Sequence, residues 1–132
     1  MITKKQYKAY KRRVRMSIIV VAFLALFLLP LPTKAANYGI ASWYGGGEKL
    51  NIFTANGEVF NPKNLTCASW DYPFNSLIKV TNITSGKAII ARVNDRGPNK
   101  RLGRSIDLSR QAFSQIADPK CGLLLVEIEK LK

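Results

Sequence analysis

The segment AIIARVNDRGP, residues 88–98, combines two features that recur through the second part of the chain. Its first half, Ala88 to Val93, has the short apolar composition of a β-strand, and it ends in the turn Arg96-Gly97-Pro98. Short segments with an apolar period close to two, separated by turn residues, are typical of small all-β domains. The segment therefore predicts a mainly β fold.

The same pattern continues on both sides of this segment. Turn signals stand at 45–47, at Asn56-Gly57 and at Ser85-Gly86. They divide the chain into six candidate strands, Tyr38–Tyr44, Leu65–Ala68, Leu77–Asn82, Ala88–Val93, Ser105–Leu108 and Leu123–Glu129. One helix is expected from Arg110 to about Ala117, with Ser109 or Asp107 as its N-cap. Repeats and a second domain are not expected.

The N-terminal part of the chain has the composition of an export signal. Residues 1–15 are rich in Lys and Arg without one acid, and 16–29 form an unbroken apolar run. Ala35 stands at a small-residue position of a signal peptidase site, so we expect a signal peptide over 1–35. A retained membrane anchor is the alternative. Both interpretations place residues 36–132 outside the cytoplasmic membrane, in the periplasm or cell envelope.

The positive charge of the chain is concentrated in this leader. Residues 1–36 hold 8 of the 21 Lys and Arg and none of the 8 acids, which leaves 13 − 8 = +5 for the remainder. A mildly basic domain suits an anionic wall or membrane surface at least as well as nucleic acid. We therefore expect no nucleic-acid partner and no membrane contact beyond the leader, and we expect a monomer.

Histidine is absent, and the chain has two cysteines, Cys67 and Cys121. Export to an oxidising compartment favours a disulfide between them, although two buried free thiols are the alternative. Neither cysteine follows the leader directly, so a lipoprotein is not expected. Without histidine the usual zinc ligands and nucleophilic triads are lacking, and we expect neither metal nor cofactor.

The remaining candidates for chemistry are carboxylates in turn-rich segments. Glu58 lies in Thr54-Ala-Asn-Gly-Glu58-Val-Phe60, and Asp95 lies in the segment that opens this section. Two such groups can share acid and base work on a glycosidic bond. Asp95 beside a turn glycine can approach a bulky sugar, so we expect both carboxyl groups to line one groove.

A wider set of motifs supports this expectation. The blocks are GIASWY at 39–44, TANGEVF at 54–60, LTCA at 65–68, PF at 73–74, VTN at 80–82, VNDRGP at 93–98 and GRSIDLS at 103–109. In this order and spacing the chain resembles the rare lipoprotein A (RlpA) family. The resemblance implies a six-stranded double-psi β-barrel, related in fold to the first domain of expansins. It also implies an endolytic peptidoglycan lytic transglycosylase, which cleaves between N-acetylmuramic acid and N-acetylglucosamine to give 1,6-anhydro ends.

The family's acidic pair falls on Asp95 and Glu58, and we expect Asp95 to be the acid and Glu58 the base. The family's histidine, which follows the Leu-Thr-x-Ala block, is replaced by Ser69. Ser69 can hydrogen-bond to a sugar but cannot shuttle protons near neutral pH. The candidate substrate-binding residues are Tyr44, Thr54, Asn56, Ser69, Trp70, Asn94, Arg96 and Arg104.

Two other functions stay open, and the replacement of the family's histidine by Ser69 supports the first of them. The first is an expansin-like module that binds or loosens wall glycans without cleaving them. The second is an inhibitor or partner-binding barrel in the envelope. Cleavage of peptidoglycan glycan strands is the function that the motifs favour.

Overall fold

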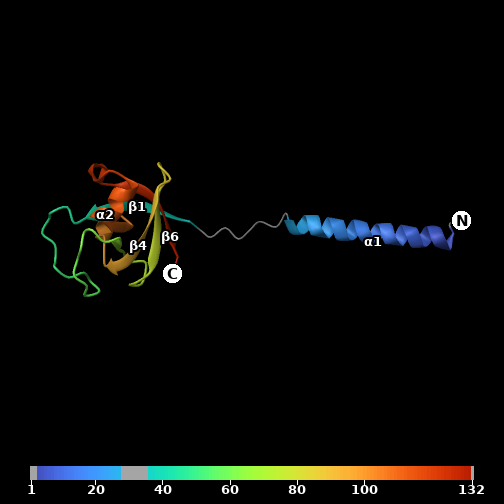
Figure 1. Cartoon of the computed structure of the whole chain (residues 1–132), viewed down its shortest axis with the longest axis horizontal. Coiled ribbons are helices and arrows are strands. Elements are labelled where there is room, and N and C mark those ends of the chain that lie inside the picture. The colour runs from blue at the N-terminus through green and yellow to red at the C-terminus, as the bar shows by residue number, and fades with distance from the viewer. Residues whose placement is uncertain (1–2, 28–35, 132) are drawn as a thin grey trace. The chain divides into compact units, whose positions relative to one another are not determined.

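The computed structural model describes residues 3–27 and 36–131 of the chain. Two compact units are present, residues 1–35 and 36–132 (Figure 1). The first contains the helix α1, Lys4–Phe27. The second contains every buried hydrophobic residue of the described core. Because this core involves no residue of α1, we expect residues 36–132 to fold independently.

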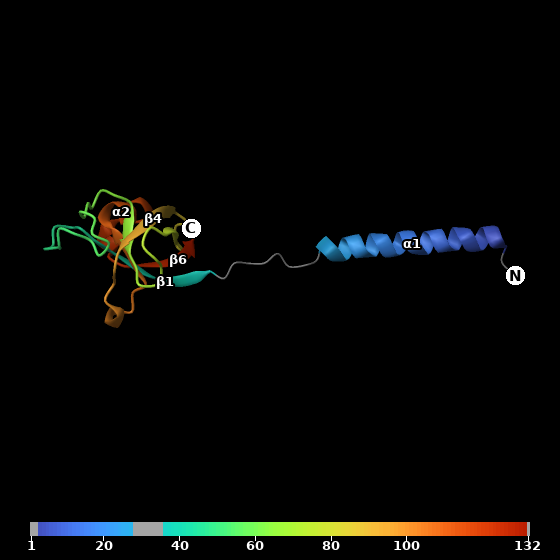
Figure 2. The same ribbon diagram turned by 90° about the horizontal axis from the view of Figure 1, so that it is seen from below.

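The second unit is a closed six-stranded barrel (Figures 1 and 2). Its strands are β1 (Asn37–Tyr44), β2 (Thr66–Ala68), β3 (Leu77–Asn82), β4 (Ala88–Asp95), β5 (Ile106–Ser109) and β6 (Leu124–Lys130). Around the barrel they follow the order β1-β5-β2-β4-β3-β6. The β1/β5 and β2/β4 pairs are parallel and the other pairs are antiparallel. The predicted mainly β fold is confirmed.

The barrel interior is filled by alternate residues of the strands, as the pleat of a strand requires. On β4, Ile89, Ala91 and Val93 are buried, whereas Ile90 is exposed and Arg92 is half-buried. The helix α2 (Arg110–Ile116) adds Phe113, which is fully buried, to this core. Truncating so large a buried side chain to Ala typically costs about 3–5 kcal/mol.

Local sequence determines where α2 begins. Ser109 is its N-cap, and its hydroxyl accepts a hydrogen bond from the Ala112 N–H. Asp107, the alternative cap, instead accepts a hydrogen bond from the Ser42 hydroxyl. Two 3₁₀ turns, η1 (Lys100–Leu102) and η2 (Pro119–Cys121), complete the unit.

Most strand boundaries agree with the sequence-based prediction to within one residue. The largest difference is at β4, which continues past Val93 to Asp95. This extension is stabilised by the parallel neighbour β2, whose Ala68 pairs with Asp95 after a register shift. The candidate acid therefore stands at the last position of a barrel strand. That position fixes its backbone more firmly than a free turn would.

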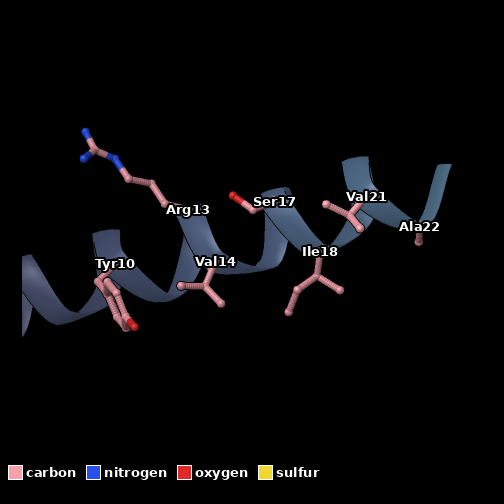
Figure 3. A pocket seen from close by; sticks show the side chains of 7 residues that line it. All are labelled: Tyr10, Arg13, Val14, Ser17, Ile18, Val21 and Ala22. Carbon is pink, nitrogen blue, oxygen red and sulfur yellow. The ribbon is translucent and has the colours of Figure 1, made fainter. Parts of the chain in front are cut away.

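The helix α1 is exposed along its length where its side chains are described. Figure 3 shows Tyr10, Val14 and Ile18 following one another along one side of the helix. Together with Arg13, Ser17, Val21 and Ala22 they line a hollow of about 650 Å³. All the lining residues belong to α1, so this hollow is the side of one helix.

The predicted signal peptide and its cleavage after Ala35 stay predictions, because 28–35 lie outside the described residues. Among the described helices, none is both long and apolar enough to cross a membrane.

The predicted disulfide is wrong, because both cysteines are free thiols. Cys67 is fully buried on β2 inside the barrel, whereas Cys121 is exposed on η2. Burial raises the pKa of Cys67 to about 12. The alternative of a small apolar core residue is therefore correct for Cys67, but Cys121 is not buried.

Candidate active site

Asp95 is fixed at the end of β4 by backbone donors. Its Oδ1 accepts hydrogen bonds from the Ala55 N–H (2.9 Å) and from the Arg96 N–H (2.8 Å). Within the described parts of the chain, no hydrogen bond to Asp95 Oδ2 is found. One carboxylate oxygen is thus used for positioning, while the other is available to a ligand.

Asp95 lines a hollow of about 410 Å³ between β4 and the long loop after β1. This loop, coloured teal to green in Figures 1 and 2, extends away from the barrel. The residues that line the hollow are Tyr44, Leu50, Asn51, Phe53, Thr54, Ala55, Phe60, Asp95 and Arg96. A cleft that combines apolar side chains with a few polar groups is typical of a ligand site.

The turn before Glu58 folds on its own hydrogen bonds. Asn56 Oδ1 accepts from the Thr54 hydroxyl (2.7 Å) and from the Glu58 N–H (3.1 Å). The Thr54 N–H donates to the Glu58 carbonyl at 2.8 Å. Gly57 has a φ of 89°, a left-handed conformation that strains other residues. The Asn56 N–H donates to the Asn94 carbonyl (3.2 Å), which ties this turn to β4.

Glu58 is held by an ion pair with β4. Arg92 Nη1 and Nη2 donate to its two carboxylate oxygens at 2.7 and 2.8 Å, and Asn94 Nδ2 donates to Oε2 at 3.2 Å. The hydrogen bonds from Arg92, followed by those from Asn94 and Asn56, lower the pKa of Glu58 to about 2. Glu58 is not among the residues that line the hollow around Asp95. The two predicted carboxylates are therefore joined by one turn, but one faces Arg92 and the other lines the hollow.

Tyr44 lies at the end of β1 and lines the same hollow as Asp95. Its ring stacks on Phe60 with the centroids 4.9 Å apart. Burial, and then the nearby charge of Asp95, raise the pKa of Tyr44, so its hydroxyl stays protonated. The hydroxyl is buried, and within the described residues it has no hydrogen-bond partner.

Ser69 is buried beside Asp95, where the resemblance predicts a histidine. Its N–H donates to the Asp95 carbonyl (3.2 Å), and its Oγ accepts from the Asp71 N–H (3.2 Å). Arg96 does not pair with the Asp95 carboxylate. Its Nη1 donates to the carbonyls of Ser69 (2.7 Å) and Tyr72 (2.9 Å). Arg96 therefore fixes the segment that contains Ser69.

Five predicted substrate-binding residues are not among those that line the hollow: Asn56, Ser69, Trp70, Asn94 and Arg104. Trp70 is 51% exposed, and its Nε1 donates to the Pro98 carbonyl at 2.7 Å. Arg104 has a buried Nε that finds no partner among the described residues. Ligand contact by any of these five residues stays a prediction.

Sequence reasoning missed Arg92, which pairs with Glu58, and three apolar residues that line the hollow, Leu50, Phe53 and Phe60. Arg92 occupies an outward position of β4. It lies 34 residues from Glu58, so no local sequence pattern predicts their ion pair. Across 3–27 and 36–131, no group of three or more His, Cys, Asp or Glu side chains is placed to hold a metal ion.

The closed six-stranded barrel and the motif residues gathered at the end of β4 define a double-psi β-barrel protein. The family described as lytic transglycolase matches residues 36–128, and the chain belongs to this family. The resemblance to the RlpA family is confirmed by curated relatives.

Two such relatives are named endolytic peptidoglycan transglycosylase RlpA. The chain is 47% identical over 102 residues to that of Rickettsia bellii, a match that covers 76% of this chain and 44% of the relative. It is 45% identical over 93 residues to that of Campylobacter jejuni, with 69% and 32% covered. The chain thus spans less than half the length of these two relatives.

Solved structures share the fold at low sequence identity. An expansin of Clavibacter michiganensis is 20% identical, with a TM-score of 0.58 over 74% of this chain and 51% of that one. The Streptomyces papain inhibitor is 18% identical, with a TM-score of 0.58 over 78% of this chain and all of the inhibitor. At this identity the likeness concerns the fold alone.

Proposed function

We propose that this chain is an endolytic lytic transglycosylase that cleaves the peptidoglycan glycan backbone between N-acetylmuramic acid and N-acetylglucosamine. The observation that carries the proposal is Asp95 at the end of β4, with one carboxylate oxygen held by two backbone N–H groups and the other without a partner among the described residues. Membership of the family and the names of the curated relatives support it. The site of action would be the cell envelope.

In the proposed reaction, protonated Asp95 acts as general acid. It gives its proton to the glycosidic oxygen, the bond to the muramic acid C1 breaks, and the sugar becomes oxocarbenium-like. The C6 hydroxyl of the same sugar then attacks C1. The hydroxyl proton passes to the carboxylate left on Asp95, which restores the acid and leaves a 1,6-anhydro end. No water enters the product.

The other residues of the site would bind and orient the glycan. Tyr44 and Thr54 would form part of the wall of the hollow, with the Tyr44 hydroxyl buried and the Thr54 hydroxyl bonded to Asn56 and to the Glu58 carbonyl. The ring of Tyr44 already stacks on Phe60, so sugar stacking would use other rings such as Phe53, which is 61% exposed.

A glycan-binding module without cleavage is the second candidate function. The observation that favours it is Ser69, which is buried beside Asp95 and brings no titratable group to the site. In that case the same hollow would bind glycan strands and release no product.

One experiment separates the two functions. The chain from 36 to 132 is incubated with purified sacculi, both intact and stripped of stem peptides, and the soluble products are analysed by mass spectrometry. We expect 1,6-anhydro-muropeptides or anhydro-ended glycans. Glycan pull-down without any anhydro product would reject the transglycosylase and leave the binding module.

A further inference from the structure

Arg92 and Asn94 connect β4 to the turn that carries Glu58. They are two residues apart on the strand. Both donate hydrogen bonds to the Glu58 carboxylate, Arg92 with both Nη atoms. The guanidinium fork matches a carboxylate in this two-armed geometry, which a lysine ammonium cannot reproduce.

A continuous series of contacts leads from this ion pair to Asp95. The Glu58 carbonyl accepts from the Thr54 N–H (2.8 Å) and from the Thr54 hydroxyl (3.2 Å). Ala55, the next residue, donates its N–H to Asp95 Oδ1 at 2.9 Å. The position of one of the two donors to Asp95 thus depends on how the turn is held against β4.

Arg92 also reaches a second loop. Its Nη1 donates to Asn75 Oδ1 at 3.0 Å, and the Asn75 N–H donates to the Val93 carbonyl at 2.8 Å. Asn75 has a φ of 66°, an uncommon conformation for a residue with a side chain. Arg92 therefore joins two loops to the strand that ends in Asp95.

We infer that Arg92 is a positioning residue: by clamping Glu58 it fixes the turn from Thr54 to Glu58, and with it the Ala55 N–H that orients Asp95. Glu58 then acts through this turn and not as the base of the reaction. The effect of Arg92 on cleavage rests on the proposed function, whereas its effect on the position of the turn does not.

The competing interpretation is an ordinary surface ion pair. Arg92 is 33% and Glu58 40% exposed, and ion pairs of such exposure typically contribute little to the stability of a protein. In the described part of the chain, Arg92 is the charged group that faces Glu58, and the other groups that face it are the amides of Asn94 and Asn56. A test must therefore measure how firmly the turn and its hydrogen bond to Asp95 are held, and not only the stability of the protein.

The first experiment measures the clamp without substrate. In the chain from 36 to 132, the Glu58 carboxyl is titrated by ¹³C NMR and the exchange rate of the Ala55 amide is measured. Arg92→Gln should raise the Glu58 midpoint from about 2 by one pH unit or more. It should also accelerate Ala55 exchange about tenfold and leave the Ile78 amide in β3 unchanged.

Matched variants define the outcome. Arg92→Lys keeps the charge but loses the fork, so it should restore much of the Glu58 midpoint and little of the Ala55 protection. Arg101→Gln, which removes an exposed arginine from η1, should change neither. Unchanged Ala55 exchange in Arg92→Gln and in Arg92→Lys overturns the inference, whatever happens to the Glu58 midpoint.

The second experiment connects the clamp to cleavage. Arg92→Gln and Glu58→Gln should each lower kcat on sacculi about tenfold with little change in KM, and the double variant should be no worse than either single one. Additive losses contradict a shared route through the turn. If the unaltered chain releases no anhydro product, the proposed function fails while the NMR measurement still decides the clamp.

Discussion

Asp95 and Glu58 are carboxylates on two sides of the same contact between a turn and a strand, and their partners differ. Both oxygens of Glu58 are bonded by the Arg92 guanidinium, and one of them also by Asn94. Asp95 has one oxygen bonded by backbone N–H groups, and it lines a hollow of about 410 Å³. Both carboxylate oxygens of Glu58 are therefore bonded within the protein, whereas one oxygen of Asp95 stays available to a ligand.

The ion pair limits what Glu58 can do with a proton. A carboxylate paired with a guanidinium holds its charge, and the pKa of Glu58 is lowered to about 2. A general acid must instead give up a proton that it carries at the working pH. Glu58 is therefore unsuited to give up a proton, and we propose proton transfer for Asp95 and positioning for Glu58, although the sequence predicts that both share the chemistry.

The largest expected effect comes from Asp95→Asn. The amide keeps the shape and can still accept the Ala55 N–H, but it has no transferable proton. General acid catalysis is typically worth about 10² to 10⁴ in rate, so release of anhydro products should fall by that factor while glycan binding stays within about twofold. Mass spectrometry of digested sacculi and a pull-down with the same sacculi measure the two quantities.

The control for this variant is Asp118→Asn, the same chemical change at the exposed N-cap of η2. It should leave product release unchanged. Full turnover by Asp95→Asn would show that the proton comes from another group, and the comparison between the two carboxylates would then fail.

The second effect concerns the reactivity of Cys67 on β2, the strand that pairs with β4 next to Asp95. In the register of β2 with β4, Cys67 pairs with Val93 and Ala68 with Asp95, so Cys67 lies one position behind the site. At pH 8 a thiol-reactive probe should label exposed Cys121 at least about 100-fold faster than Cys67, since Cys67 is buried and its pKa is raised to about 12. Peptide mapping by mass spectrometry distinguishes the two sites. Similar labelling rates for the two cysteines would mean that the barrel opens at β2 and exposes Cys67.

A smaller effect is expected from Glu58→Gln. The variant keeps the length of the side chain and loses the charge that Arg92 binds, so the turn should loosen without losing the acid. Product release should fall about tenfold, well short of the effect of Asp95→Asn. A loss as large as that of Asp95→Asn, with Ala55 exchange unchanged, would restore Glu58 as a reacting group.

The sequence predicts the strands well because alternation and turn residues are local signals. The six strands were placed within one residue except at the end of β4, and Ser109 was among the caps expected for α2. The motif blocks also predicted the family that the comparisons confirm. Asp95, Tyr44, Thr54 and Arg96 were expected at the site, and the structure brings them to one hollow.

The misses depend on where side chains point in three dimensions. Two cysteines in an exported chain suggested a disulfide, but Cys67 faces the barrel interior and Cys121 lies on an exposed turn. Glu58 was expected to line the groove, but it turns toward Arg92, 34 positions along the chain. No period or turn signal in a single sequence reports such a pairing.

The smallest expected effect is on the pH dependence of stability, and its sign follows from the ion pair. The pKa of Glu58 lies at about 2 in the folded chain, below its ordinary value of 4.5. A lowered pKa stabilises the folded state above about pH 4.5, and this contribution is lost as the pH falls toward 2. Because Glu58 and Arg92 are 40% and 33% exposed, solvent screens the pair, and we expect a loss of less than about 1 kcal/mol.

Urea unfolding at pH 6 and at pH 2.5 measures this loss. The quantity is the extra decrease in the free energy of unfolding of the unaltered chain relative to Glu58→Gln. Raising the salt to about 1 M should reduce this extra loss, since the pair is accessible to ions. Equal losses in both chains would mean that the pair contributes nothing to stability, and any effect of Glu58→Gln on Asp95 would then have to come from the geometry of the turn alone.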